Sequence, residues 1–119
     1  MSQSSAQASA FYQEIASAGS VWSIRDKDGI PAPIGDGGKR SMPFWSLSSR
    51  AEKVINTVPA YKGFTVFEIE LAVFTERWLS GLQKDGLQVG VNWSGSKAVG
   101  YDLPPQDVKL SLEHHLSNV

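Results

Sequence analysis

The residues best suited to chemistry in this chain are the serines and the arginine at positions 46–50. A strand that ends in serines where a helix begins directs backbone N–H groups and the positive end of the helix dipole at one spot, which attracts anions. Arg50 adds a fork of N–H donors, Arg40 and Lys53 are expected nearby, and Trp45 offers a flat apolar wall. The stretch therefore predicts a site for a small anionic ligand, formed by Arg40, Trp45, Ser46, Ser48, Ser49 and Arg50.

The local charge favours the same site. Residues 37–67 contain five basic residues against Glu52 alone, a local charge of about +4 in a chain of net charge −1. The structural alternative is that Ser48 or Ser49 caps the helix, Arg50 pairs with a surface carboxylate, and Trp45 fills the edge of the core. Both interpretations stay open at the level of sequence.

Three of the four tryptophans are followed by serine: Trp22-Ser23, Trp45-Ser46 and Trp93-Ser94. Tryptophan combines a large apolar body with one N–H group, so it is enriched at binding surfaces. We therefore expect a non-catalytic protein-interaction or regulatory domain whose contact surface surrounds Trp45 and Arg50. The alternative is a small-molecule sensor or minor enzyme that holds an anionic ligand at residues 46–50.

A second candidate contact region is the turn at residues 92–97, where Asn92 and Lys97 are the expected contacts. Trp93 has two interpretations here. It alternates in phase with Leu87, Val89 and Val91 and so is expected on the core face, whereas a contact residue would be exposed.

No catalytic constellation is complete. The chain has no cysteine, and its two histidines, His114 and His115, are neighbours that a helix would point about 100° apart, so they are expected in a solvated tail and bind no metal together. A serine hydrolase would need a base beside Ser46 or Ser94, and no histidine precedes position 114. We expect no cofactor and do not favour an enzyme.

The length and charge limit the remaining classes. A chain of 119 residues predicts one domain, residues 1–119, with residues 1–7 and 117–119 as flexible ends. A net charge of −1 gives no broad positive field for nucleic acid, and no apolar run is long enough to span a membrane. We expect a cytoplasmic protein, and the oligomeric state stays open.

Periodicity predicts the elements that position these residues. Helices are expected around residues 8–18, from a capping box of Ser49 and Glu52 to Pro59, at residues 71–82, and after Pro104 and Pro105. The second helix is expected to bury Leu47, Ala51, Val54, Ile55 and Val58. A first hairpin is expected from strands at residues 21–25 and 30–34, and a second hairpin from strands at residues 87–94 and 99–103. Two further strands are expected, one at residues 39–45 and one at residues 64–69 that is covered on both faces. The predicted fold is α+β, a mainly antiparallel twisted sheet of about five to six strands with about four helices packed against it.

Several motifs resemble the bacterial family catalogued as domain of unknown function 2750. They are Pro43-Phe44-Trp45-Ser46 with Arg50-Ala51-Glu52, Phe74 with Trp78-Leu79, Gly90-Val91-Asn92-Trp93-Ser94-Gly95, and Tyr101-Asp102-Leu103 with Pro105. The similarity covers about Phe11 to Val108. The resemblance implies a small bacterial cytoplasmic α+β protein and assigns no catalytic residue.

Overall fold

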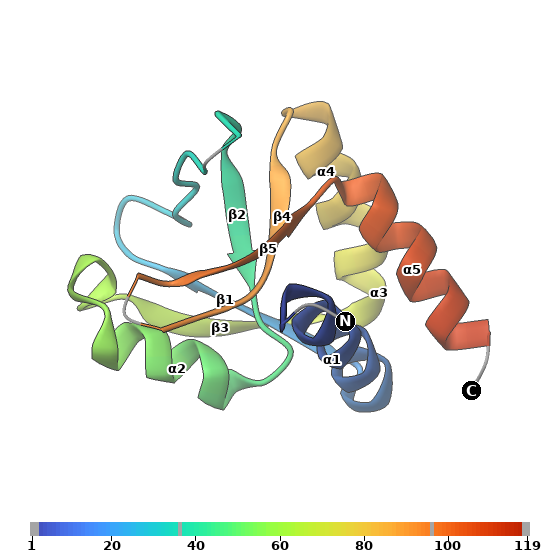
Figure 1. Cartoon of the computed structure of the whole chain (residues 1–119), viewed down its shortest axis with the longest axis horizontal. Helices are drawn as coiled ribbons and strands as arrows, with labels where there is room; N and C mark the ends of the chain where they lie inside the picture. Colours follow the sequence, from blue (N-terminus) through green and yellow to red (C-terminus); the bar gives the residue numbers. More distant parts are fainter. Residues whose placement is uncertain (1–2, 36, 96, 118–119) are drawn as a thin grey trace.

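The strands form two small sheets rather than the single, mainly antiparallel sheet that the sequence predicts. In the computed structural model, which describes residues 3–35, 37–95 and 97–117, β1 (Ser20–Arg25) pairs antiparallel with β3 (Thr65–Glu70) (Figure 1). The second sheet has the order β2 (Ser41–Phe44), β4 (Gln88–Ser94), β5 (Val99–Leu103), and its β2–β4 pair is parallel. The described residues thus form an α+β fold of five strands and four helices.

The two sheets meet at two tryptophans. The Trp22 N–H donates to the Trp45 carbonyl over 2.8 Å, and the Trp45 N–H donates back to the Trp22 carbonyl over 2.7 Å. This isolated bridge joins Trp22 of β1 to Trp45, which directly follows β2. It therefore connects the two sheets through a single pair of residues.

The predicted first hairpin is wrong. Residues 30–34 form no strand, because Pro31 and Pro33 have no N–H to donate to a ladder. Of this segment, only Ile34 makes a bridge, to Arg40, and β1 instead pairs with the distant β3. The expectation that β3 is covered on both faces holds in part: the neighbouring residues Val66 and Phe67 pack against different hydrophobic clusters, but both stay partly exposed and only Ile69 of this strand is buried.

Helices occur where the periodicity predicts them. α1 (Gln3–Ala18) ends at Gly19, whose φ of 75° favours glycine, and α5 (Pro105–Ser117) closes the described chain. The N-terminal segment that was expected to be flexible is therefore helical from Gln3 onward. Residues 1–2, 36, 96 and 118–119 lie outside the described residues. They include Asp36 and Ser96, which the sequence places in turns.

The third helix is continuous but not uniform. α3 (Leu71–Val73) leads into a π-helical turn, η2 (Phe74–Trp78), and then into α4 (Leu79–Lys84). The turn places two aromatic rings against Phe44, with centroid distances of 5.0 Å to Phe74 and 5.9 Å to Trp78. The rings thus fix this helix against the end of β2.

α2 (Ser48–Thr57) begins where the sequence predicts, but not by the predicted cap. Leu47 occupies the N-cap position and no side chain caps the helix, so the capping box of Ser49 and Glu52 is wrong. Leu47 itself is 37% exposed rather than part of the buried face. Ala51 and Val54 are buried as expected. A 3-10 turn, η1 (Pro59–Tyr61), follows the helix.

Two hydrophobic clusters hold the fold together. The larger lies between the three-stranded sheet and the helices α1, α4 and α5, which gather on one side of the molecule, whereas α2 covers the other side alone (Figure 1). The smaller cluster lies beneath α2 and is formed by Ile24, Trp45, Ala51, Val54, Val58, Trp93 and Ala98. The candidate site borders this smaller cluster.

Candidate functional site

A bulge in β4 shapes the site. Val91 pairs with Tyr101 and Ser94 with Val99, so Asn92 and Trp93 together face a single residue of β5, Gly100. Asn92 has a φ of 49°, a left-handed conformation that asparagine tolerates better than most residues. The extra residue reverses the alternation of side chains beyond it.

Trp93 is therefore buried, as predicted, but on the other face of the strand. It is 5% exposed and belongs to the smaller cluster, while Val89 and Val91 belong to the larger one. Its ring lies over Gly90, where an added Cβ would come within 2.4 Å of the ring. Its Nε1 donates to Oδ1 of Asp102 over 2.9 Å, which fixes the ring in place.

The three Trp-Ser pairs converge on this cluster. Trp45 is 0% exposed, and its Nε1 donates to the carbonyl oxygen of Trp93 over 2.8 Å. Trp22 is half-buried against the same cluster. The interpretation of Trp45 as an exposed contact residue is wrong, because its side chain is fully buried in the smaller cluster at the junction of the sheets.

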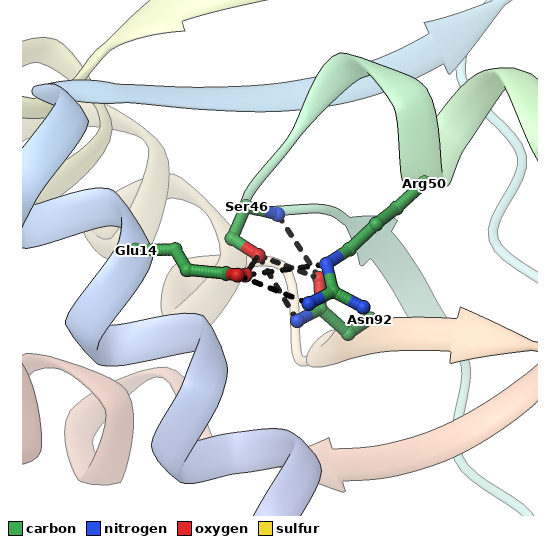
Figure 2. A network of polar contacts seen from close by, with 4 residues as sticks. All are labelled: Glu14, Ser46, Arg50 and Asn92. Atoms are coloured by element: carbon green, nitrogen blue, oxygen red, sulfur yellow. Dashed lines mark hydrogen bonds and ion pairs between the residues drawn. The ribbon is translucent and has the colours of Figure 1, made fainter.

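A network of polar side chains lies next to Trp45 (Figure 2). Asn92 accepts from the Ser46 N–H through Oδ1 at 3.0 Å and donates from Nδ2 to the Ser46 hydroxyl at 3.0 Å. The Ser46 hydroxyl in turn donates to the Glu14 carboxylate of α1. Arg50 binds the same carboxylate with two donors, Nε at 3.2 Å and Nη2 at 3.0 Å. The network thus ties α1, α2 and β4 to the connection between β2 and α2, with Ser46 and Arg50 bound directly to the Glu14 carboxylate.

The charge on Glu14 is stabilised in this network. Partial burial alone would raise the pKa of Glu14, but the hydrogen bonds from Arg50 and Ser46 and the Arg50 charge outweigh burial and lower the pKa below its ordinary value of 4.5. The structural alternative for Arg50, an ion pair with a carboxylate, is the arrangement seen, with Glu14 as the partner. Nothing in the sequence pattern pointed to Glu14, which lies far from Arg50 along the chain.

A cavity of about 440 Å³ opens beside this network, between α2 and the end of β4. Two cations of α2, Arg50 and Lys53, lie three residues apart and so share one helix face. No carboxylate is among the residues that line the cavity, which are Arg50, Lys53, Val54, Thr57, Asn92, Trp93, Ser94 and Gly95. Two predicted site residues, Arg50 and Asn92, are therefore brought together, and Lys53 joins them.

The other predicted site residues lie elsewhere. Arg40 is exposed and donates from Nη1 to the Ala32 carbonyl at 2.9 Å, while Lys97 lines a separate cavity of about 260 Å³. Ser48 is half-buried, Ser49 is exposed, and neither side chain caps α2. The Ser46 N–H, expected to bind an anion at the start of the helix, is occupied by Asn92.

The histidines differ from expectation. His115 is half-buried, with its ring centroid 5.3 Å from that of Tyr12 and its Nδ1 2.9 Å from the Ser111 carbonyl oxygen, so a fully solvated tail is wrong for this residue. Among the described residues, no three side chains of the metal-binding types gather at one place, and none of the helices has the length and apolar character to cross a membrane.

Comparison with known protein families identifies the family of this chain. The sequence model of a family described as proteins of unknown function, DUF2750, matches residues 8–112. The chain belongs to the DUF2750 family. The matched residues of this DUF2750 protein include the whole polar network and the entire lining of the cavity beside α2. No curated protein matches the chain.

Proposed function

We propose that this protein binds a small organic anion in the cavity between α2 and β4. One observation carries the proposal: Arg50 and Lys53 line the same cavity, and the lining residues that the structure describes include no carboxylate. Lys53, together with the part of the Arg50 guanidinium that Glu14 does not hold, favours a carboxylate or a phosphate, which such cations bind by charge-assisted hydrogen bonds. The volume of about 440 Å³ is within the range of small-molecule pockets.

The apolar part of the lining suits a ligand with a ring or short chain. Val54 and Trp93 line the cavity together with Asn92 and Ser94, so a ligand can bury an apolar body while its anionic group meets Arg50 and Lys53. Glu14 occupies Nε and Nη2 of Arg50, so Nη1 is the Arg50 donor assigned to the ligand in this proposal.

A binding role fits this lining better than catalysis. The lining residues include no histidine, cysteine or carboxylate that would act as a base or nucleophile. That a protein partner contacts Arg50 and Lys97 stays a prediction. Trp45, the residue expected at the centre of that contact surface, is buried and so offers no exposed ring to a partner. We expect the ligand to be a metabolite of the cytoplasm, the compartment that the sequence predicts.

A thermal-shift experiment tests the proposal. Phenyl phosphate serves as the probe, with inorganic phosphate for charge alone and benzyl alcohol for the apolar body alone. A ligand at about 100 times its dissociation constant adds about 2.7 kcal/mol to the free energy of unfolding, or on the order of 10 °C for a domain of this size. We expect phenyl phosphate to give the largest shift.

Two variants locate the site. Lys53→Gln removes one cation of the cavity and is expected to abolish most of the shift, whereas Lys109→Gln removes an exposed cation of α5 that does not line the cavity and is expected to leave the shift unchanged. Equal shifts in both variants, or no shift with any anion, would overturn the proposal.

A further inference from the structure

We propose a second ligand site, for a small organic ammonium ion, in a cavity between α1, β5 and α5. This cavity has a volume of about 610 Å³. The helices α1 and α5 that contribute to its lining contact each other, and α5 lies on the opposite side of the molecule from α2 (Figure 1). The residues that line it are Ala8, Ser9, Tyr12, Tyr101, Leu103, Asp107, Leu110, Ser111, His114 and His115.

Aromatic rings dominate the polar part of this lining. Two tyrosines and two histidines line the cavity, and the rings of Tyr12 and His115 lie 5.3 Å apart, tilted by 39°. The His114 and His115 rings are 6.1 Å apart and meet edge to face. The electron-rich face of a tyrosine ring attracts a cation, and several such rings around one space are the means by which proteins bind ammonium groups.

The charges of the lining favour the same ligand. Among the described residues that line it, Asp107 is the only carboxylate, and none is lysine or arginine. The field of Asp107 reaches the Tyr12 ring: burial raises the pKa of Tyr12, the hydrogen bond with Ser111 acts against burial, and Asp107 and Tyr101 raise the pKa further. A carboxylate next to neutral tyrosines attracts a cation and repels the anions that suit the cavity beside α2.

The apolar remainder of the cavity indicates an ammonium carried on an organic body. Leu103 and Leu110 line the same space, and Leu110 is 59% exposed, so its apolar surface is open to a ligand. A metal ion is a poorer fit, since the described residues hold no cluster of three metal-binding side chains. An alkyl or quaternary ammonium ion can pack its apolar groups against the leucines and place its charge near both the aromatic rings and the Asp107 carboxylate.

A titration followed by ¹⁵N NMR near pH 8, where ordinary imidazoles are neutral, tests this site. Choline is the probe, and 3,3-dimethylbutan-1-ol, which has the same shape without the charge, is the control ligand. We expect choline to shift amide signals of the lining residues and to bind about fivefold or more tightly than the alcohol. Equal affinities, shifts outside the cavity, or no saturable shift at millimolar choline would overturn the proposal.

A pair of variants separates charge from shape. Asp107→Asn is expected to reduce choline binding to the level of the alcohol, while Glu113→Gln, the same change on an exposed residue of the same helix outside the cavity, leaves choline binding unchanged. Choline binding that survives Asp107→Asn at full strength would contradict the proposal. The comparison of the two ligands on the unaltered protein needs no variant, so the test holds even if a substitution destabilises the fold.

Discussion

The carboxylate of Glu14 ties α1 to the start of α2 through Ser46 and Arg50. Glu14→Gln removes the ion pair, which is partly exposed, so we expect a loss of about 1 kcal/mol in the free energy of unfolding at pH 7. Because the folded state lowers the pKa of Glu14, this stabilisation is present above pH 4.5 and is lost as the pH falls below it.

Urea unfolding of both proteins across this pH range measures the effect. The difference between Glu14→Gln and the unaltered protein should shrink as the pH falls below 4.5. Glu52→Gln, which neutralises an exposed carboxylate of α2, is the control and should change stability by less than about 0.5 kcal/mol. A difference that stays constant down to the lowest pH would contradict this account of Glu14.

The same residue also competes with any anion for Arg50. Neutralising Glu14 releases Nε and Nη2 of the guanidinium and removes a negative charge next to the cavity. We therefore expect Glu14→Gln to bind phenyl phosphate about threefold more tightly at low salt, measured by isothermal titration calorimetry. Weaker binding in this variant would mean that Glu14 orients Arg50 for the ligand rather than competing with it.

Residue types and charge indicated part of this site from the sequence. Arg50 and Asn92 were expected as contacts, and Lys53 was expected close to Arg50, where the cavity lining places it. Glu14 was missed because its contact with Arg50 joins helices that no local pattern relates. Trp45 was misjudged for a similar reason, since its burial depends on Trp22 and Trp93, which reach it from other strands.

At the scale of the element, the ring of Trp93 packs closely against the backbone of β4 at Gly90. An alanine at Gly90 would place its Cβ 2.4 Å from that ring, which Asp102 holds in position, so we expect Gly90→Ala to cost about 1–3 kcal/mol. Gly81→Ala in α4 meets nothing within 4 Å and should instead stabilise by about 0.5–1 kcal/mol. Urea unfolding of both variants checks the contrast, and a neutral Gly90→Ala would show that the ring moves freely.

Helices were predictable because the spacing of Phe11 and Ile15, or of Phe74 and Trp78, is a local property of the chain. Strand partners were not, since β1 pairs with a strand that follows it by forty residues along the chain, as in the pair Arg25 with Thr65. The bulge at Asn92 was also hidden, because the alternation of apolar residues continues through it and only the backbone shows the reversal.

For the whole molecule, the two clusters should unfold together. The Trp22–Trp45 bridge joins the two sheets, and the Glu14 network ties α1, which packs in the larger cluster, to α2, which covers the smaller one, so opening one cluster should loosen the other. Trp78→Phe leaves three tryptophans, all in or against the smaller cluster, so its fluorescence reports that cluster, while far-ultraviolet circular dichroism reports chiefly the helices. We expect the two signals to change at the same urea concentration, and separate midpoints would contradict this.

Binding of an organic anion between α2 and β4 is the central claim, and a ¹⁵N NMR titration with phenyl phosphate tests it most directly. We expect saturable shifts at the amides of residues 53–57 and 92–95, with affinity reduced about tenfold in Lys53→Gln, equivalent to about 1.4 kcal/mol, and unchanged in Lys109→Gln. Shifts that map to another surface, or the same affinity in Lys53→Gln as in the unaltered protein, would contradict the claim.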